Sequence, residues 1–566
     1  MISSRSRRYT IGEGITTYFR SSQENTLALS RWQVMAFLLI LITSIALSLS
    51  NYDSFQLGSY MDDASYAVLA KSIVHSNTYG LINTPVQPAS TRYPFGFPLI
   101  LSVFVLLYPS AIRMLKVASL LATILNMVLI FWGWPYISQH RSRWWGLIIA
   151  ALYAVSPLVI GHSKMVMSEP AFTTLVLLTL ILAEKFLPRK EAQFIPTFLT
   201  GMIMMFAVFT RTIGVILTIA IVIRILMLPL DKSIKQRKLF YILLGGIVFI
   251  ALVVALTPVT LKSLLPNEYM NQLTAPHEWG QSRIENAFLP RIFGAFKEYL
   301  SSHLRLAIIP MGGGASELEL GKRFGIPNLP FITGLLIGCF ILLGSFSVFQ
   351  KQGLFPTVLI FEVLYFTVIL LWPWRDARFL YPILLFLLYD FLWGIRILAK
   401  QLNRLRFISG RMSIFIADAG LAIVILAIFS VSLYKGISNH DNDLQYVRDL
   451  RVGTRWLKEN TSSDAIVMAQ QSQGIYLYSE RKTVDFPFEG NHPSKGQFEN
   501  ILRTQGVNYI LVAPEMAWHQ DGSLSYDQFT SETMLPLLDE LKQQNIVKVV
   551  YASDADMVVI YQFLNR

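Results

Sequence analysis

Cysteine and charged residues are both scarce in this sequence. The single cysteine, Cys339, lies inside an apolar run, which excludes an intramolecular disulfide and a zinc site built on cysteine ligands. Only 15% of the residues are charged, whereas a soluble globular chain carries roughly 25%. A deficit of this size, together with repeated apolar runs, argues against a soluble globular protein.

Long apolar runs occupy most of the chain. Hydrophobic residues make up 53% of it, and the mean hydropathy is +0.47. About eleven runs are long enough to cross, or nearly to cross, a hydrocarbon core of roughly 30 Å. The sequence therefore predicts a polytopic α-helical protein that passes many times through a plasma (inner) membrane. The predicted spans are 32–50, 112–137, 144–161, 170–187, 194–210, 212–229, 239–258, 329–349, 354–372, 379–398 and 413–434.

Basic residues lie in the gaps between these runs. The net charge of +12 is spread over many loops instead of one soluble face, so no nucleic-acid partner is expected. Loops rich in Lys and Arg alternate with poorer loops, which places the N-terminal tail 1–31 in the cytoplasm. The loops 51–111 and 259–328 then lie outside, as does the C-terminal region. The run 32–50 is interpreted as an uncleaved signal anchor, because no small-x-small cleavage site follows it.

The first outer loop is too long to be a simple connector. Residues 63–76 have helical spacing, and residues 98–108 are apolar but too short to span a membrane. Both segments suit helices that lie in the outer interface. For 98–108, a half-buried hairpin without function is the alternative.

The composition changes after the transmembrane part, 32–434. Residues 435–566 carry ordinary charge, and helical and extended patterns alternate in them, which predicts a small extracytoplasmic α/β domain. The region has no Gly-x-Gly-x-x-Gly motif, so no nucleotide is expected there. Helices are predicted near 441–460, 494–505 and 530–543, and strands at 465–469, 507–512, 547–551 and 557–563.

Several short motifs lie on the predicted outer side. They are Asp62-Asp63 followed by Tyr66, Tyr-Pro-Phe-Gly-Phe-Pro at 93–98, Ser-Glu-Pro at 168–170, Thr-Arg at 210–211 and Arg-Phe-Leu-Tyr-Pro at 378–382. In order and spacing they resemble the GT-C membrane glycosyltransferases. The similarity is to the branch that holds dolichyl-phosphate-mannose protein mannosyltransferases and bacterial aminoarabinose and undecaprenyl-phosphate-sugar transferases. The resemblance covers about residues 30–435.

The chain departs from the family pattern at three places. The usual acidic pair is Asp-Glu, and here it is Asp62-Asp63. Phe95 replaces the second proline of the Tyr-Pro-Pro-Gly-Tyr-Pro segment. Arg92 precedes Tyr-Pro where aminoarabinose transferases have Lys-Pro-Pro, which argues against that substrate.

The resemblance implies a glycosyltransferase with a polyprenyl-phosphate-sugar donor, transfer outside the cytoplasm and inversion at the anomeric carbon. The acceptor is a lipid, a glycan or a protein, and membrane lipids surround the site. A transporter or flippase of lipid-linked sugars is the alternative, although the two related halves expected of a transporter are not seen. An inactive scaffold is a third reading.

The acidic residues of these motifs are the candidate catalytic groups. Asp62 matches the leading acidic position of the family and is assigned as the general base, while Asp63 orients the acceptor or shares a metal. The alternative for both is an N-cap of the helix 64–76. Glu169 opens an outer-side helix before Pro170, where a catalytic role and a favourable placement at the helix dipole are equally good readings. A divalent metal is compatible with this site, but no ligand set identifies one.

Arginines of the same side are candidates for the donor phosphate. Arg211 interrupts an apolar run, where a charge costs about 2.5–3.5 kcal/mol and calls for a partner or a cavity. A guanidinium suits a phosphate. Arg378 is the preferred phosphate ligand by resemblance, and Arg375 is expected to pair with Asp376. The further candidates are Arg92 and Arg305 for phosphate, and Tyr66, Tyr93, His162 and Lys164 for other substrate contacts.

Three further carboxylates lie within or near the predicted spans. Glu362, Asp390 and Asp418 form no repeated pattern. Pairing inside the protein, or a position at the inner interface, is therefore preferred to the proton relay of a transporter.

Overall fold

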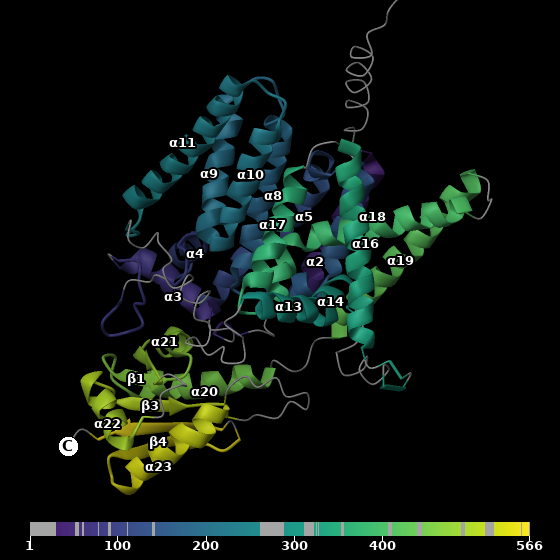
Figure 1. Ribbon diagram of the computed structural model, residues 1–566. Coiled ribbons are helices and arrows are strands. Elements are labelled where there is room, and N and C mark those ends of the chain that lie inside the picture. Colours follow the sequence, from purple (N-terminus) through teal and green to yellow (C-terminus); the bar gives the residue numbers. More distant parts are fainter. Residues whose placement is uncertain are drawn as a thin grey trace, which may run out of the picture.

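The computed structural model consists of a large assembly of helices and a smaller part built on a β-sheet (Figure 1). It describes residues 30–564, so residues 1–29 of the predicted tail and much of the loop 259–328 lie outside the described residues. The gaps within the described range are 51, 53–55, 59–61, 77, 89–91, 110, 139–141, 261–287, 311–321, 324, 327, 353–355, 406–409, 439–443, 488–492, 515–525 and 556.

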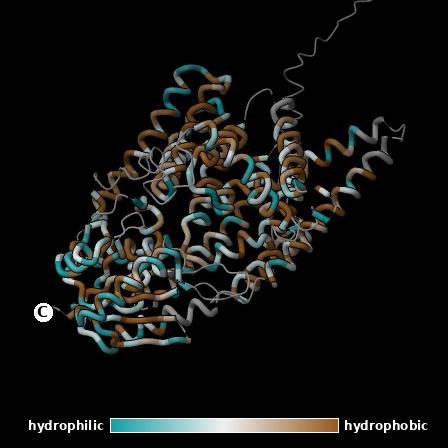
Figure 2. Tube along the Cα trace, turned by 60° about the horizontal axis from the view of Figure 1, so that its bottom comes forward, coloured by the Kyte–Doolittle hydropathy of each residue, from teal (hydrophilic) through white to brown (hydrophobic). Residues whose placement is uncertain are grey.

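Every predicted span coincides with helical structure. Figure 2 shows hydrophobic residues along most of the length of these helices. Their bounds are α2 Arg31–Ser50, η1 Ile112–Leu115 with α5 Lys116–Ile137, α6 Arg143–Val155 with α7 Pro157–Ser163, α8 Ser168–Phe186, α9 Phe194–Thr210, η2 Thr212–Gly214 with α10 Val215–Met227, α11 Lys232–Leu256, α16 Leu329–Gln352, α17 Thr357–Leu371, η6 Ala377–Ile383 with α18 Leu384–Leu405, and α19 Gly410–Ser438.

The structure supports fewer membrane crossings than the eleven predicted, if each crossing helix must be both long enough and apolar enough. Within the described residues, six helices are long and apolar enough to cross a membrane, or seven if the bent pair α6 and α7 is one span. Four apolar helices are shorter, among them α9 and α17. The chain is therefore a multi-pass membrane protein, whereas the figure of about eleven spans stays a prediction.

Two breaks in the helices have local causes. The pair α6 and α7 bends by 66° at Ser156, since the residue before a proline avoids the helical region. Ser156 accordingly has an extended backbone, with φ −62° and ψ 125°. Between α9 and α10, Arg211 is also extended, with φ −147° and ψ 131°. This second break brings a guanidinium into an otherwise apolar segment.

The first outer loop contains the two helices predicted for it. They are α3, Asp62–His75, and α4, Gly96–Leu107, and they pack on one another. Gly96 lets α4 approach α9, because a Cβ there would collide with the carbonyl of Phe209. The residues of α3 are largely buried, and its first residue is Asp62. Whether these helices lie in a membrane interface is still a prediction.

A mixed sheet of five strands forms the smaller part. The strand order is β2-β1-β3-β5-β4, in which β1 is parallel to β2 and β3, and β5 is antiparallel to β3 and β4. The predicted strands and helices are all present, but β2 and α21 were not predicted. The bounds are α20 Leu444–Asn460, β1 Ile466–Ala469, α21 Ser472–Ser479, β2 Lys482–Asp485, α22 Lys495–Thr504, β3 Tyr509–Val512, η7 Thr530–Met534, α23 Leu535–Gln543, β4 Val547–Ser553 and β5 Val558–Phe563.

The sheet is attached to the loop that follows α3. Thr483 of β2 donates its backbone N–H to the carbonyl of Asn83 at 2.7 Å, and the Asn83 amide donates to Thr483 Oγ1 at 3.1 Å. Lys482 Nζ donates to the carbonyl of Ile82 at 2.5 Å. The strand β2, which was not predicted, is thus the one that joins the sheet to the loop.

Candidate active site

Asp62 is bound by two donors from distant parts of the chain. Its Oδ2 lies 2.8 Å from Arg378 Nη1, and its Oδ1 accepts the hydroxyl of Tyr93 at 2.6 Å. Arg378 lies in η6, where Asp376 accepts its backbone N–H at 2.9 Å and faces its Nε at 3.4 Å. The side chain of Asp62 is 21% exposed, so solvent still reaches it.

The protonation states of this group follow from its partners. Burial raises the pKa of Asp62, but the charge of Arg378, the hydroxyl of Tyr93 and the charge of Arg92 together bring the pKa below its usual value. Asp62 is therefore a carboxylate at neutral pH. Burial and the neighbouring Asp62 raise the pKa of Tyr93 well above its usual value, so Tyr93 keeps its proton and donates.

Asp63 has a different environment from Asp62. Its side chain is nearly fully buried, Oδ2 accepts the backbone N–H of Gly58 at 2.8 Å, and Oδ1 accepts the N–H of Ala64 at 2.7 Å. These bonds fix the backbone just before and at the start of α3. Asp63 is the second residue of α3 and therefore not its N-cap, although it binds N–H groups before and within the first turn, while Asp62 faces the arginine.

A second acid–arginine pair lies at the start of α8. Glu169 Oε1 is 2.6 Å from Arg211 Nη1, and the same nitrogen donates to Ser168 Oγ at 3.0 Å. The side chain of Glu169 is only 1% exposed, and its Oε2 has no hydrogen-bond partner among the described residues. A carboxylate at the first turn of a helix also faces the free N–H groups there. Both readings of Glu169 are therefore compatible with its position.

Aromatic rings connect the two pairs. The guanidinium of Arg378 lies 5.2 Å from the ring of Phe379, and that of Arg211 lies 5.9 Å from the same ring. On the other side, the Tyr66 hydroxyl is 3.2 Å from Ser168 Oγ, and its ring is 5.0 Å from that of Tyr93. The first outer loop, the start of α8, the α9–α10 break and η6 thus meet at one place.

The remaining predicted residues surround this network to different degrees. Arg92 lies over the ring of Tyr93 at 5.2 Å. His162 contacts the carbonyl of Leu158 at 2.8 Å, and Lys164 is buried at the end of α7. Arg305 is buried in α14, Leu304–Ile308, where its Nε donates to the carbonyl of Ser301. Arg305 is not part of the network of contacts described above.

One pairing differs from its prediction, and two contacts were not foreseen. Arg375 binds Glu298 of α13, Phe288–Glu298, at 2.9 Å, while Asp376 turns to Arg378. The prediction of an Arg375–Asp376 pair is wrong because the extended backbone at Asp376 sends adjacent side chains to opposite sides. Ser168 and Phe379 were read only as parts of motifs, although each contacts an arginine.

No metal site is evident around Asp62 among the described residues. The described part of the chain contains no group of three or more His, Cys, Asp or Glu side chains arranged around one point. Both oxygens of Asp62 already accept from protein donors. A metal at Asp62 would have to displace Arg378, so the residues present do not fit one.

The chain matches no protein-family model and no curated protein. Its fold does match solved structures. The oligosaccharyltransferase AglB from Archaeoglobus fulgidus, in complex with an inhibitory peptide and a dolichol-phosphate, is 13% identical, with a TM-score of 0.56 over 95% of this chain and 74% of that one. ArnT from Cupriavidus metallidurans, bound to undecaprenyl phosphate, is 11% identical, with a TM-score of 0.54 over 95% and 99%. These structural neighbours are GT-C glycosyltransferases, and at such identities the likeness establishes that this chain has the GT-C fold.

Proposed function

We propose that the chain is a glycosyltransferase that moves a sugar from a polyprenyl-phosphate donor to an acceptor on the outer side of the membrane. The observation that carries the proposal is the meeting of two carboxylate–arginine pairs, Asp62–Arg378 and Glu169–Arg211, around Phe379 in a GT-C fold. Sugar transfer from a lipid phosphate needs a base for the acceptor and cations for the leaving phosphate. This arrangement supplies both kinds of group.

The proposed reaction uses Asp62 as the base. The acceptor oxygen forms a bond to the anomeric carbon and gives its proton to Asp62. The bond from that carbon to the phosphate oxygen breaks, and its electron pair goes to the lipid phosphate. Arg378 and Arg211 stabilise the charge on the phosphate, since a guanidinium binds two phosphate oxygens at once. Attack from the side opposite the leaving group inverts the anomeric carbon.

The donor and acceptor are proposed at the level of chemical class. The two similar structures hold dolichol-phosphate and undecaprenyl phosphate, which supports a polyprenyl-phosphate carrier here. One of them also holds an inhibitory peptide. A protein is therefore proposed as a possible acceptor, in addition to a lipid or a glycan. The outer location follows from the predicted orientation of the basic loops.

No structural observation favours the alternative of a flippase. The two solved structures reported above are GT-C glycosyltransferases. A scaffold without activity would need neither a partly exposed carboxylate nor a charged arginine at its side.

Deletion and complementation test the proposal. The gene would be deleted in cells that carry it natively, and envelope glycans, lipids and proteins would be compared by mass spectrometry. We expect one hexose- or pentose-sized mass to disappear, to return with the wild-type chain, and to stay absent with Asp62→Asn at equal membrane abundance. If Asp62→Asn restored the missing mass in full, Asp62 would not be the base. An unchanged glycan profile after deletion would contradict glycosyl transfer altogether.

A further inference from the structure

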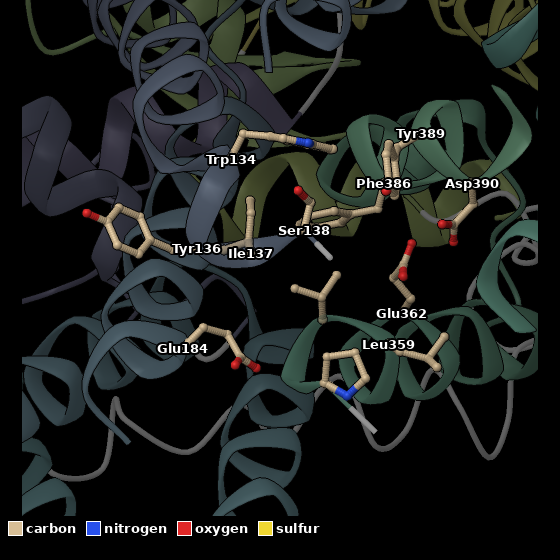
Figure 3. Close-up of a pocket in the computed structure, with 12 residues that line it drawn as sticks. Trp134, Tyr136, Ile137, Ser138, Glu184, Leu359, Glu362, Phe386, Tyr389 and Asp390 are labelled. Atoms are coloured by element: carbon tan, nitrogen blue, oxygen red, sulfur yellow. The ribbon is translucent and has the colours of Figure 1, made fainter. Parts of the chain in front are cut away.

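A separate cavity of about 60 Å³ lies among α5, α8, α17 and α18 (Figure 3). It is far from the Asp62 site. Glu169 lies in the first turn of α8 and Glu184, which lines the cavity, lies in its last turn. At 1.5 Å per residue, these two positions are about 22 Å apart. The cavity therefore belongs to the opposite ends of the helices that carry the candidate active site.

The cavity holds an acidic pair with incomplete bonding. Glu362 is 8% exposed, and its Oε1 has no hydrogen-bond partner among the described residues. Asp390 is 5% exposed and accepts a hydrogen bond from Ser345 through Oδ2. Figure 3 shows both carboxylates on the same side of the cavity. No Lys or Arg is among the described residues that line it.

A third, independent group in the cavity also lacks a partner. Trp134 is 1% exposed and lines the same space, and its indole N–H finds no acceptor among the described residues. Glu184 shows the contrast, because Thr357 and Arg224 bind both of its oxygens. One buried acceptor and one buried donor are thus left for something that enters the cavity, and a buried polar group without a partner destabilises the fold.

We propose that this cavity binds a single small cation together with a water molecule. The carboxyl groups of Glu362 and Asp390 would hold the cation, because two acids that line one buried cavity can both ionise only if a cation balances their charge, and otherwise keep a proton. The water would accept the indole N–H of Trp134. Oxygen ligands of this kind suit alkali and alkaline-earth ions or an ammonium group. The cavity volume admits a few water-sized groups and no larger ligand.

Thermal unfolding of the purified full chain in lipid nanodiscs tests the site. The chlorides of Na⁺, K⁺, Mg²⁺, Ca²⁺ and ethanolammonium would be titrated at pH 8 and constant ionic strength, with N-methylglucamine as the reference cation. We expect at least one of them to raise the Tm in a saturable way. In Glu362→Gln and Asp390→Asn, the concentration for half the effect should increase at least tenfold.

Two controls decide between this site and others. Asp62→Asn should keep the cation effect, as should Glu499→Gln, which changes a partly exposed carboxylate of α22 outside the cavity. Should the cavity variants fail to fold, equilibrium dialysis of Asp62→Asn should still give about one bound cation per chain. A missing or unsaturable effect, an effect kept in Glu362→Gln, an effect lost in Asp62→Asn, or dialysis without bound cation would each overturn the proposal. The first of these results would leave a shared proton as the occupant.

Discussion

Arg378 and Asp62 form an ion pair at 2.8 Å although they are 316 positions apart in the chain. The guanidinium also faces Asp376 at 3.4 Å, so it lies between two carboxylates. A phosphate that bound Arg378 would compete with Asp62 for the same nitrogens. Binding of a lipid phosphate would then free the Asp62 carboxylate to accept a proton. The pair thus offers a simple way to activate the proposed base only when the donor is present.

The first prediction concerns the base. Asp62→Asn keeps the shape of the side chain but accepts no proton, so kcat for sugar transfer should fall by about 10²–10⁴-fold. The KM for the donor should not rise, because Arg378 stays in place to bind the phosphate and a neutral amide competes for it less than the Asp62 carboxylate does. Initial rates with purified protein and a polyprenyl-phosphate-sugar donor would measure both constants.

Asp63→Asn is the matched control for this prediction. Asp63 binds the backbone N–H groups of Gly58 and Ala64, so its loss should lower the free energy of unfolding by about 1–3 kcal/mol. We expect kcat to stay within about tenfold of wild type, well short of the loss in Asp62→Asn. A larger loss of kcat in Asp63→Asn than in Asp62→Asn would reverse the assignment of the two aspartates.

The second prediction separates charge from packing at the other pair. Arg211→Met leaves Glu169 buried without its partner and should destabilise the fold by about 3–5 kcal/mol. The double variant Arg211→Met with Glu169→Gln removes both charges and should recover most of that stability. Activity should stay low in both variants, because only Arg378 is left to bind the phosphate. Unfolding and transfer rates would be measured on the same preparations, and a double variant with wild-type rates would dismiss Arg211 as a phosphate ligand.

Much of the fold could be predicted because a segment that crosses a bilayer must be apolar along its length, and this shows in the local composition. Each apolar run became helical, and the break at Arg211 appeared where the charge interrupts the run. The number of crossings was less accessible, since helices such as α9 and α17 are too short to be assigned by length alone. In the sheet part, β2 was missed because it has only four residues, Lys482–Asp485, and only one of them is apolar.

The candidate site could be predicted as a set of residues but not as a set of pairs. The motifs pointed to Asp62, Glu169, Arg211 and Arg378 one by one. The pairing of each acid with an arginine depends on contacts between segments that are far apart in the chain. Those contacts cannot be predicted from local sequence. Arg375 illustrates the limit, because its neighbour Asp376 was the obvious partner and Glu298 of another helix is the actual one.

The third prediction concerns the pH profile. Because the pKa of Asp62 lies below its usual value, the base stays ionised from neutral pH down to about pH 4, where an unperturbed Asp titrates. Transfer should therefore lose its rate only below that pH. The same depressed pKa means that Asp62 contributes stability above the unfolded-state pKa and loses it as the pH falls through the folded-state value.

Tyr93→Phe tests the cause of this shift. The Tyr93 hydroxyl donates to Asp62 and helps to lower its pKa, so its removal should move the acidic limb of the rate profile to higher pH. Tyr79→Phe is the control, because its hydroxyl bonds to the Tyr93 carbonyl and not to the carboxylate. An acidic limb that moves equally in both variants, or in neither, would contradict the proposed effect of the Tyr93 hydroxyl on the base.

The last prediction concerns the close crossing of α9 and α11. A Cβ at Gly201 would overlap the carbonyl oxygen of Ile242, and a Cβ at Gly245 would overlap that of Phe198. Both obstacles are backbone atoms, which cannot rotate away as a side chain can. Gly201→Ala should therefore force the helices apart and cost about 1–3 kcal/mol of stability.

Gly420→Ala in α19 is the control, since nothing lies within 4 Å of its Cβ position and alanine favours a helix over glycine by about 1 kcal/mol. Thermal unfolding in one detergent should then rank Gly201→Ala below wild type and Gly420→Ala at or above it. Equal Tm values for Gly201→Ala and wild type would show that α9 and α11 are not held together at this crossing.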